Sequence, residues 1–154
     1  MPPTNSELRK VCDGASNICG ASLLDASTTR SRQTANPVVH WEVNGKDGPA
    51  LHKFFGDLFD WEVLTDNPMG YGLVNADSEC DYSIGGGIGQ TFDGSAGFVT
   101  FYVEVEDVTS TLEKAAGLGG SILMPETNVM EGVTIGHFAD PEGHIIGLLK
   151  KVPM

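Results

Sequence analysis

The fold is decided by two stretches of the sequence, VVHWEVNGKDGPALHKFF (residues 38–55) and VTFYVEVEDVTSTLEKAA (residues 99–116). Each begins with alternating, strand-type residues that end in Glu-Val, passes through an acidic turn, and continues as a helix with apolar residues at helical spacing. The strand-like segments WEV (61–63) and SIL (121–123) follow the two helices at corresponding places. An internal repeat of about 55 residues indicates two copies of one supersecondary unit.

Further strand-like stretches complete each copy. They are YGLVN (71–75), SIGGGIGQ (83–90), VTIGHFAD (133–140) and HIIGLLKK (144–151). The order is therefore β-α-β-β-β, twice, and neither copy can bury a sheet face alone. We predict an α+β fold in which two βαβββ modules, residues 37–90 and 97–151, form one curved mixed sheet with a central cup and the helices outside. The glycine run in SIGGGIGQ would let a ligand, or the facing half, approach the bare backbone closely.

Composition excludes several classes of protein. The chain has 154 residues, of which 40% are hydrophobic and 19% charged, so it can bury a real core. Its formal net charge of -12 argues against nucleic acid and anionic membrane surfaces as partners, because both require a basic footprint. No apolar run approaches the roughly 20 residues of a membrane span. Three scattered cysteines (Cys12, Cys19 and Cys80) do not form a disulfide framework, which favours a reducing, cytoplasmic setting.

The first 36 residues differ from the rest of the chain. They are rich in Ser, Thr, Asn and Ala and contain no aromatic residue. Their apolar stretch ICGASLL is too short for the core of a signal peptide, and acidic residues interrupt any transit-peptide pattern. We expect residues 1–36 to be a poorly structured arm and residues 37–151 to be the folded domain.

The arrangement resembles the vicinal oxygen chelate superfamily, which has the glyoxalase, bleomycin-resistance and extradiol dioxygenase fold. The likeness is carried by PVVHWEV, by the helix ending in FFGDLFDWEV, by FYVEVEDVTSTLEKAAGLGG and, most specifically, by HFADPEGHIIGLL at residues 137–149. It covers residues 37–151. The resemblance implies the fold described above and a small-molecule ligand, but a shared fold does not fix the reaction.

Metal-dependent members of this superfamily place ligands on the opening strand of each half and on the closing strand. The resemblance puts these positions at Val38, Thr100 and Gly147. None of the three offers a charged or imidazole side chain to a divalent metal. We therefore expect no metal and no other cofactor.

The opening strands place polar side chains in the cup. Alternation turns Val38, His40 and Glu42 toward the cup, while Trp41 packs under a helix. The same parity turns three residues of the second opening strand toward the cup, namely Thr100, Tyr102 and Glu104. The repeat places His40 opposite Tyr102 and Glu42 opposite Glu104. Because unpaired buried charge is costly, these groups indicate either an acid–base site or a cup that is wet and merely solvated by them.

We take His40 and Glu42 as catalytic candidates. The substrate-binding candidates are Val38, Thr100, Tyr102, Glu104, His137 and Tyr71. His137 is included because its closing strand can reach the cup, and Tyr71 because it lies near the rim. His144 follows the DPEG turn and is expected to be a surface residue.

Three functions remain open from the sequence. The first is a metal-independent enzyme in which a His/Glu pair acts as base on a small polar substrate. The second is a protein that sequesters a small hydrophobic or cationic compound without turnover, as in the bleomycin-resistance branch. The third is a regulatory or structural dimer with a vestigial cup. In each case we expect a homodimer.

Overall fold

The computed structural model describes residues 35–153, and the features below are those of this part of the chain. It contains two helices and eight strands. In chain order they are β1 (Val38–Gly45), α2 (Gly48–Phe59), β2 (Val63–Leu64), β3 (Gly72–Val74), β4 (Gly86–Gln90), β5 (Phe98–Val105), α3 (Val108–Gly117), β6 (Ser121–Met130), β7 (Val133–Ala139) and β8 (Ile145–Lys150). The β-α-β-β-β order predicted from the sequence is present twice. The arm predicted at residues 1–36 lies almost entirely outside the described residues.

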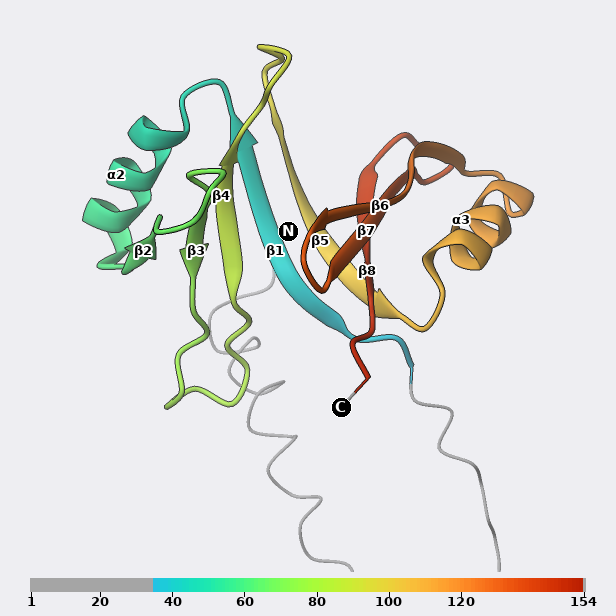
Figure 1. Cartoon of the computed structure of the whole chain (residues 1–154), viewed down its shortest axis with the longest axis horizontal. Helices are drawn as coiled ribbons and strands as arrows, with labels where there is room; N and C mark the ends of the chain where they lie inside the picture. Colours follow the sequence, from blue (N-terminus) through green and yellow to red (C-terminus); the bar gives the residue numbers. More distant parts are fainter. Residues whose placement is uncertain (1–34, 154) are drawn as a thin grey trace, which may run out of the picture. The chain divides into compact units, whose positions relative to one another are not determined.

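All eight strands form a single sheet in the order β2-β3-β4-β1-β5-β8-β7-β6. The second half of this order repeats the first in reverse, with β5 in the place of β1 and β8 in the place of β4. The two opening strands β1 and β5 pair antiparallel at the centre, and each pairs in parallel with the last strand of its own half. The predicted α+β fold with a curved, mixed sheet is thereby confirmed. Figure 1 shows α2 beside β2–β4 and α3 beside β6–β8.

Both helices begin at an aspartate that follows an opening strand. The Asp47 side chain accepts a hydrogen bond from the Ala50 backbone N–H (3.0 Å), and the Asp107 side chain accepts one from that of Ser110 (2.7 Å). Such caps satisfy N–H groups that have no partner within the helix. Helix α2 ends at Asp60 in the left-handed region (φ 56°). The same kind of aspartate N-cap therefore starts the helix in both halves of the repeat.

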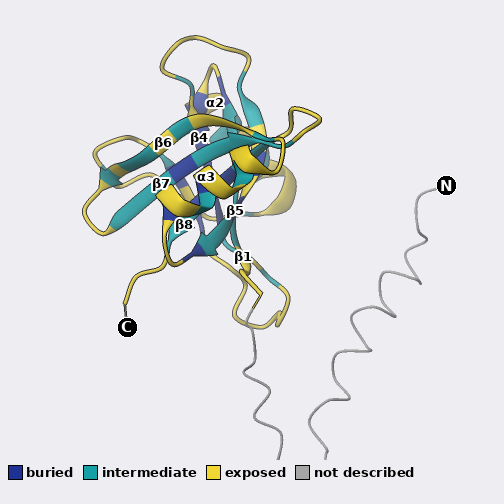
Figure 2. Ribbon diagram, turned by 90° about the vertical axis from the view of Figure 1, so that its right-hand side faces the viewer, coloured by how far each residue is buried: buried dark blue, intermediate teal, exposed yellow. Residues whose placement is uncertain are grey.

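The helix-facing side of the sheet carries two different cores. Under α3, Val105 and Leu148 of the sheet pack with Val108 and Leu112 of the helix, all nearly inaccessible to solvent. Under α2 the core is aromatic, and the Trp41 ring lies 5.0 Å from that of Trp61. Figure 2 shows the buried residues concentrated along strands, while loops and the outer sides of helices are exposed. No helix within residues 35–153 has both the length and the apolar character needed to cross a membrane.

Candidate functional site

The two opening strands place His40 and Tyr102 directly opposite each other on the sheet. His40 and Glu42 lie on the face opposite Trp41, whose ring packs on Trp61 and whose indole N–H donates to the Ile84 carbonyl (2.9 Å). Tyr102 is 3% exposed, whereas His40 and Glu42 are half-buried. The alternation of β1 therefore brings one imidazole and one carboxylate to the concave side of the sheet.

The register differs from the sequence prediction for Glu42. The residue opposite Glu42 is Thr100, not Glu104. Because β1 and β5 are antiparallel, a residue that follows His40 in β1 lies opposite a residue that precedes Tyr102 in β5. The repeat makes Glu42 and Glu104 equivalent, but equivalence in a repeat does not make two residues neighbours across the ladder. The two carboxylates consequently lie on opposite sides of the central pair.

A β-bulge changes the position of Val38. The register shifts between Val38 and His40, so that Val38 pairs with Val103. Val103 packs against the core under α3. The extra residue breaks the alternation that the sequence prediction extended from His40 back to Val38. Val38 is thereby separated from the polar side chains of the cup.

Glu42 is the centre of a side-chain hydrogen-bond network. The Tyr71 hydroxyl donates to Glu42 Oε2 (2.9 Å), and the Tyr102 hydroxyl lies 3.2 Å from each carboxylate oxygen. The Asn44 amide also donates to Glu42 Oε1. Three donors from β1, β5 and the segment before β3 therefore converge on one carboxylate. An ionised carboxylate accepts hydrogen bonds only, and such a set of donors matches that form.

Each tyrosine hydroxyl also contacts a histidine. His40 Nε2 lies 3.0 Å from the Tyr71 hydroxyl, and His137 Nε2 lies 2.9 Å from the Tyr102 hydroxyl. Since each hydroxyl donates a hydrogen bond to Glu42, its oxygen can only accept a hydrogen bond from the imidazole. Both histidines then carry a proton on Nε2. We call the chain His40–Tyr71–Glu42–Tyr102–His137 the cup network.

Burial sets the protonation of the two histidines and the two tyrosines of the cup network. Desolvation lowers the pKa of His40 and of His137 below the usual histidine value, and the nearby Glu42 charge opposes this only in part. Burial also raises the pKa of Tyr71 and Tyr102 far above the usual tyrosine value, and the Glu42 charge adds to the effect. At neutral pH the imidazoles are neutral and both phenols keep their protons.

Two glycines make room for the tyrosine rings. A Cβ on Gly87 would lie 2.0 Å from the Tyr71 hydroxyl oxygen, and one on Gly147 would lie 2.5 Å from the Tyr102 ring. Gly87 belongs to the glycine run for which the sequence predicts a close approach. The group that approaches is a side chain of the same half of the chain. The short strand β4 therefore positions Tyr71 against Glu42.

Two remaining candidates take other positions. The Thr100 hydroxyl is buried and donates to the Ile145 carbonyl (2.7 Å), which joins β5 to the start of β8. Glu104 is half-buried, and among the described residues its carboxylate takes no part in the cup network. Asn44 was not predicted. Its position two residues after Glu42 on the same strand face was the signal that could have identified it.

Comparison with known proteins identifies the family. The sequence model of the Glyoxalase/Bleomycin resistance protein/Dioxygenase superfamily matches residues 37–148. The chain belongs to this superfamily. The resemblance inferred from the sequence is thus confirmed.

Curated relatives and solved structures are similar to this chain to different degrees. The protein named "Putative glyoxylase CFP32" of Mycobacterium tuberculosis is 27% identical over 143 residues, covering 78% of this chain and 54% of the relative. The chain thus spans about half the length of the curated relatives it matches. Streptomyces coelicolor methylmalonyl-CoA epimerase has 14% identity and a TM-score of 0.53, with 77% of this chain and 96% of that chain covered. A hypothetical protein of Bacillus halodurans has 12% identity and a TM-score of 0.54, with 78% and 97% covered. At these identities the solved structures show the shared fold alone.

The residues present do not fit the metal site of the metal-dependent members. Val38 pairs with Val103 and faces away from the cup, and the Thr100 hydroxyl donates to the Ile145 carbonyl. Gly147 has no side chain and lies under the Tyr102 ring. Within residues 35–153, no three His, Cys, Asp or Glu side chains are grouped so as to hold a metal ion. That the protein works without a metal remains a prediction.

Proposed function

We propose that this superfamily member is a metal-independent enzyme that moves a proton on a small polar organic substrate. One observation carries the proposal. A single carboxylate, Glu42, accepts hydrogen bonds from two tyrosine hydroxyls that in turn contact two neutral histidines. Titratable groups whose pKa values are moved by burial and by one shared charge are typical of acid–base sites.

The proposed chemistry assigns a role to each member of the cup network. A substrate carbonyl or hydroxyl oxygen competes with Glu42 for the proton of one tyrosine, and this frees one carboxylate oxygen to act as base. Glu42 then takes a proton from the substrate, while the tyrosine O–H stabilises the negative charge that develops on the substrate oxygen. The high pKa of Tyr71 and Tyr102 keeps both hydroxyls in the donor form.

The histidines act as positioning residues in this scheme. The Nε2–H of His40 donates to the Tyr71 oxygen, and that of His137 donates to the Tyr102 oxygen. These contacts fix the direction in which each hydroxyl donates. The half-buried His40 and Tyr71 also leave part of the network accessible from the concave side.

A second candidate function is sequestration of a small cationic compound without turnover. It is favoured by the rings that surround the carboxylate. The Tyr102 ring lies 5.8 Å from that of His40 and 5.5 Å from that of His137, with Glu42 against its hydroxyl. A carboxylate beside aromatic rings suits an organic cation.

Deuterium exchange separates the two functions. Small aldehydes, ketones, hydroxy acids and amines are incubated with the protein in D2O, and loss of C–H signals is followed by NMR. We expect enzyme-dependent exchange for at least one carbonyl compound, reduced at least about 100-fold in Glu42→Gln. Glu104→Gln is the matched control, because it removes the equivalent carboxylate outside the network. Binding of amines with no exchange of any compound would favour sequestration and overturn the enzyme.

The wider setting is part of the same proposal. We propose residues 37–151 as one ligand-binding domain, a cytoplasmic location and a homodimer. Cys80 is a free, exposed thiol, which suits a reducing compartment. Phe54, Leu58 and Phe59 of α2 are each more than half exposed and offer an apolar surface to a second copy. Sedimentation at micromolar concentration tests the dimer.

A further inference from the structure

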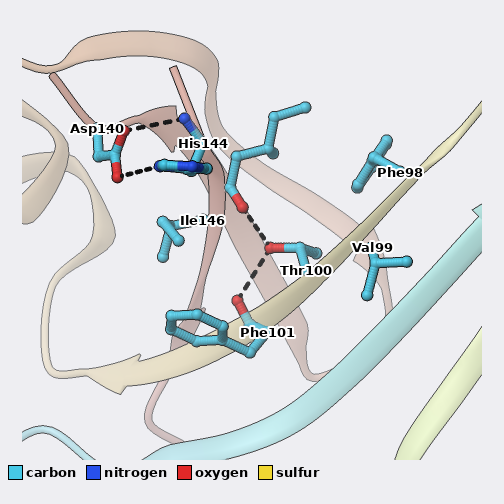
Figure 3. A pocket seen from close by; sticks show the side chains of 8 residues that line it. Phe98, Val99, Thr100, Phe101, Asp140, His144 and Ile146 are labelled. Carbon is cyan, nitrogen blue, oxygen red and sulfur yellow. Dashed lines mark hydrogen bonds and ion pairs between the residues drawn. The ribbon is translucent and has the colours of Figure 1, made fainter. Parts of the chain in front are cut away.

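A pocket lies beside the first half of β5, apart from the cup network. Pairing of β5 with β8 starts only at Tyr102 and Gly147, so within residues 35–153 no strand pairs with the earlier residues of β5 on this side. The pocket has a volume of about 480 Å³. Figure 3 shows Asp140 and His144 on one side of it, and Phe98 and Val99 on the other.

The walls of this pocket are mainly apolar. Val99, Phe101 and Ile146 contribute from the helix-facing side of the sheet, and Val99 is 73% exposed. The volume falls within the range of small-molecule sites, which combine apolar walls with a few placed polar groups. An exposed valine beside a half-exposed phenylalanine also offers apolar area that a ligand can cover.

One polar corner of the pocket is held rigidly by the turn between β7 and β8. Asp140 Oδ1 accepts the backbone N–H groups of Glu142 and His144 (2.9 Å each). The Asp140 N–H donates to the His144 carbonyl (3.0 Å), and the Gly143 N–H donates to that of Asp140 (2.9 Å). The other carboxylate oxygen lies 2.8 Å from His144 Nδ1. The imidazole is therefore fixed at the pocket rim by the turn itself.

Asp140 also determines which nitrogen of His144 can accept a hydrogen bond from a ligand. Asp140 has a lowered pKa because it accepts hydrogen bonds from His144 and Glu142, so its carboxylate is ionised and can only accept. His144 Nδ1 must then carry the proton. In the neutral imidazole this leaves Nε2 with a lone pair, ready for an O–H or N–H donor.

We propose that this pocket is a second ligand site, which binds a small molecule with an aromatic or branched apolar body and one O–H or N–H donor. The apolar body lies against Val99, Phe101 and Ile146, and the donor bonds His144 Nε2. The Phe98 ring, which lines the pocket, meets the His137 ring edge-on at 6.0 Å. The site is thus separate from the cup network but is joined to it through one side-chain contact.

Indole and 1-methylindole are the probes for this site, because they share one shape and differ in the N–H donor. Each is titrated into uniformly ¹⁵N-labelled full-length protein, and the dissociation constant is obtained from backbone amide shifts. We expect indole to shift the amides of Val99, Phe101 and Ile146 and to bind about five- to tenfold more tightly than 1-methylindole, the worth of one hydrogen bond.

The variant His144→Phe keeps a ring at the rim and removes the acceptor. It should bind indole as weakly as the wild-type protein binds 1-methylindole. Glu142→Gln, an exposed change in the same turn, should bind indole as the wild type does. Equal affinity of the two probes for the wild type would overturn the proposal. So would an absence of saturable binding, or shifts confined to His40, Glu42 and Tyr102.

Discussion

The two halves of the domain share a scaffold but divide the chemistry unequally. His40 of β1 faces Tyr102 of β5 across the central ladder. His40 bonds Tyr71, which precedes β3, and Tyr102 bonds His137 of β7, the counterpart of β3. Each half thus supplies one histidine and one tyrosine. His40 and Tyr102 stand at equivalent places in the repeat, whereas Tyr71 precedes β3 and His137 lies within β7.

The carboxylates break this symmetry. Glu42 and Glu104 stand at equivalent places in the repeat, yet both tyrosines bond Glu42. A repeated scaffold therefore has a single acidic centre, and the second half contributes its tyrosine and histidine to the carboxylate of the first. Variants in each half and on each face of β1 measure how far the two halves and the two faces differ.

The largest effect is expected from the helix-facing side of β1. Trp41→Ala should destabilise the protein by about 3 kcal/mol, because the ring packs on Trp61 and lies over Gly86. His40→Ala, one residue away on the other face, should cost less than about 1 kcal/mol, since it removes a half-buried polar group. Urea unfolding of the two variants measures this. The reverse order of destabilisation would mean that the faces of β1 have been exchanged.

A smaller effect should distinguish the two tyrosines. Tyr102→Phe is expected to cost about 2 kcal/mol of unfolding free energy and Tyr71→Phe about 1 kcal/mol, since both lose a bond to a charged group but Tyr102 is more buried. Thermal and urea unfolding provide the two values. Equal losses of unfolding free energy in the two variants would show that the greater burial of Tyr102 does not strengthen its contribution.

The fold followed from the sequence because its signals are local. Alternation in β1 identifies the two faces, an acidic turn precedes each helix, and the repeat implies that two β-α-β-β-β units share one sheet. The neighbours of Glu42 did not follow, because Glu42 and Glu104 are indistinguishable in the repeat and only the antiparallel register separates them. The bulge at the start of β1 has no signal in its sequence.

The sequence placed Tyr71 near the rim but did not predict its hydrogen bond to Glu42. Its ring reaches Glu42 because Gly87, a residue far along the chain, leaves space for it. The glycine run indicated a close approach without naming the group that approaches. Contacts of this kind depend on which strands become neighbours, and on the volume left between them.

The pH dependence of stability should report the two histidines. Their folded-state pKa values lie below the ordinary value of 6.5, so below that pH the unfolded chain binds more protons than the folded one. Stability should therefore fall as the pH decreases from 7.5 to 5.5. The double variant His40→Gln/His137→Gln should show a flatter profile over this window in urea unfolding. An unchanged slope would place the responsible groups elsewhere.

The smallest effect is expected from removing metals. The places that correspond to metal ligands in metal-dependent relatives are taken by Val38, Thr100 and Gly147, and the Tyr102 ring covers the last of them. Dialysis against EDTA should leave the unfolding midpoint unchanged, because a ligand that binds only the folded state would have raised it. Elemental analysis of protein purified without chelators should find no stoichiometric zinc, iron, nickel or manganese.

A bound equivalent of metal would contradict this prediction and would change the comparison between the halves. The candidate ligands would be His40 and Glu42 of the first half and His137 of the second, which would have to move closer together because the structure joins them only through tyrosine hydroxyls. His137→Ala should then lower the metal content while Glu104→Ala leaves it unchanged. In that case the two halves would share a metal centre, and Tyr71 and Tyr102 would surround it instead of donating to a free carboxylate.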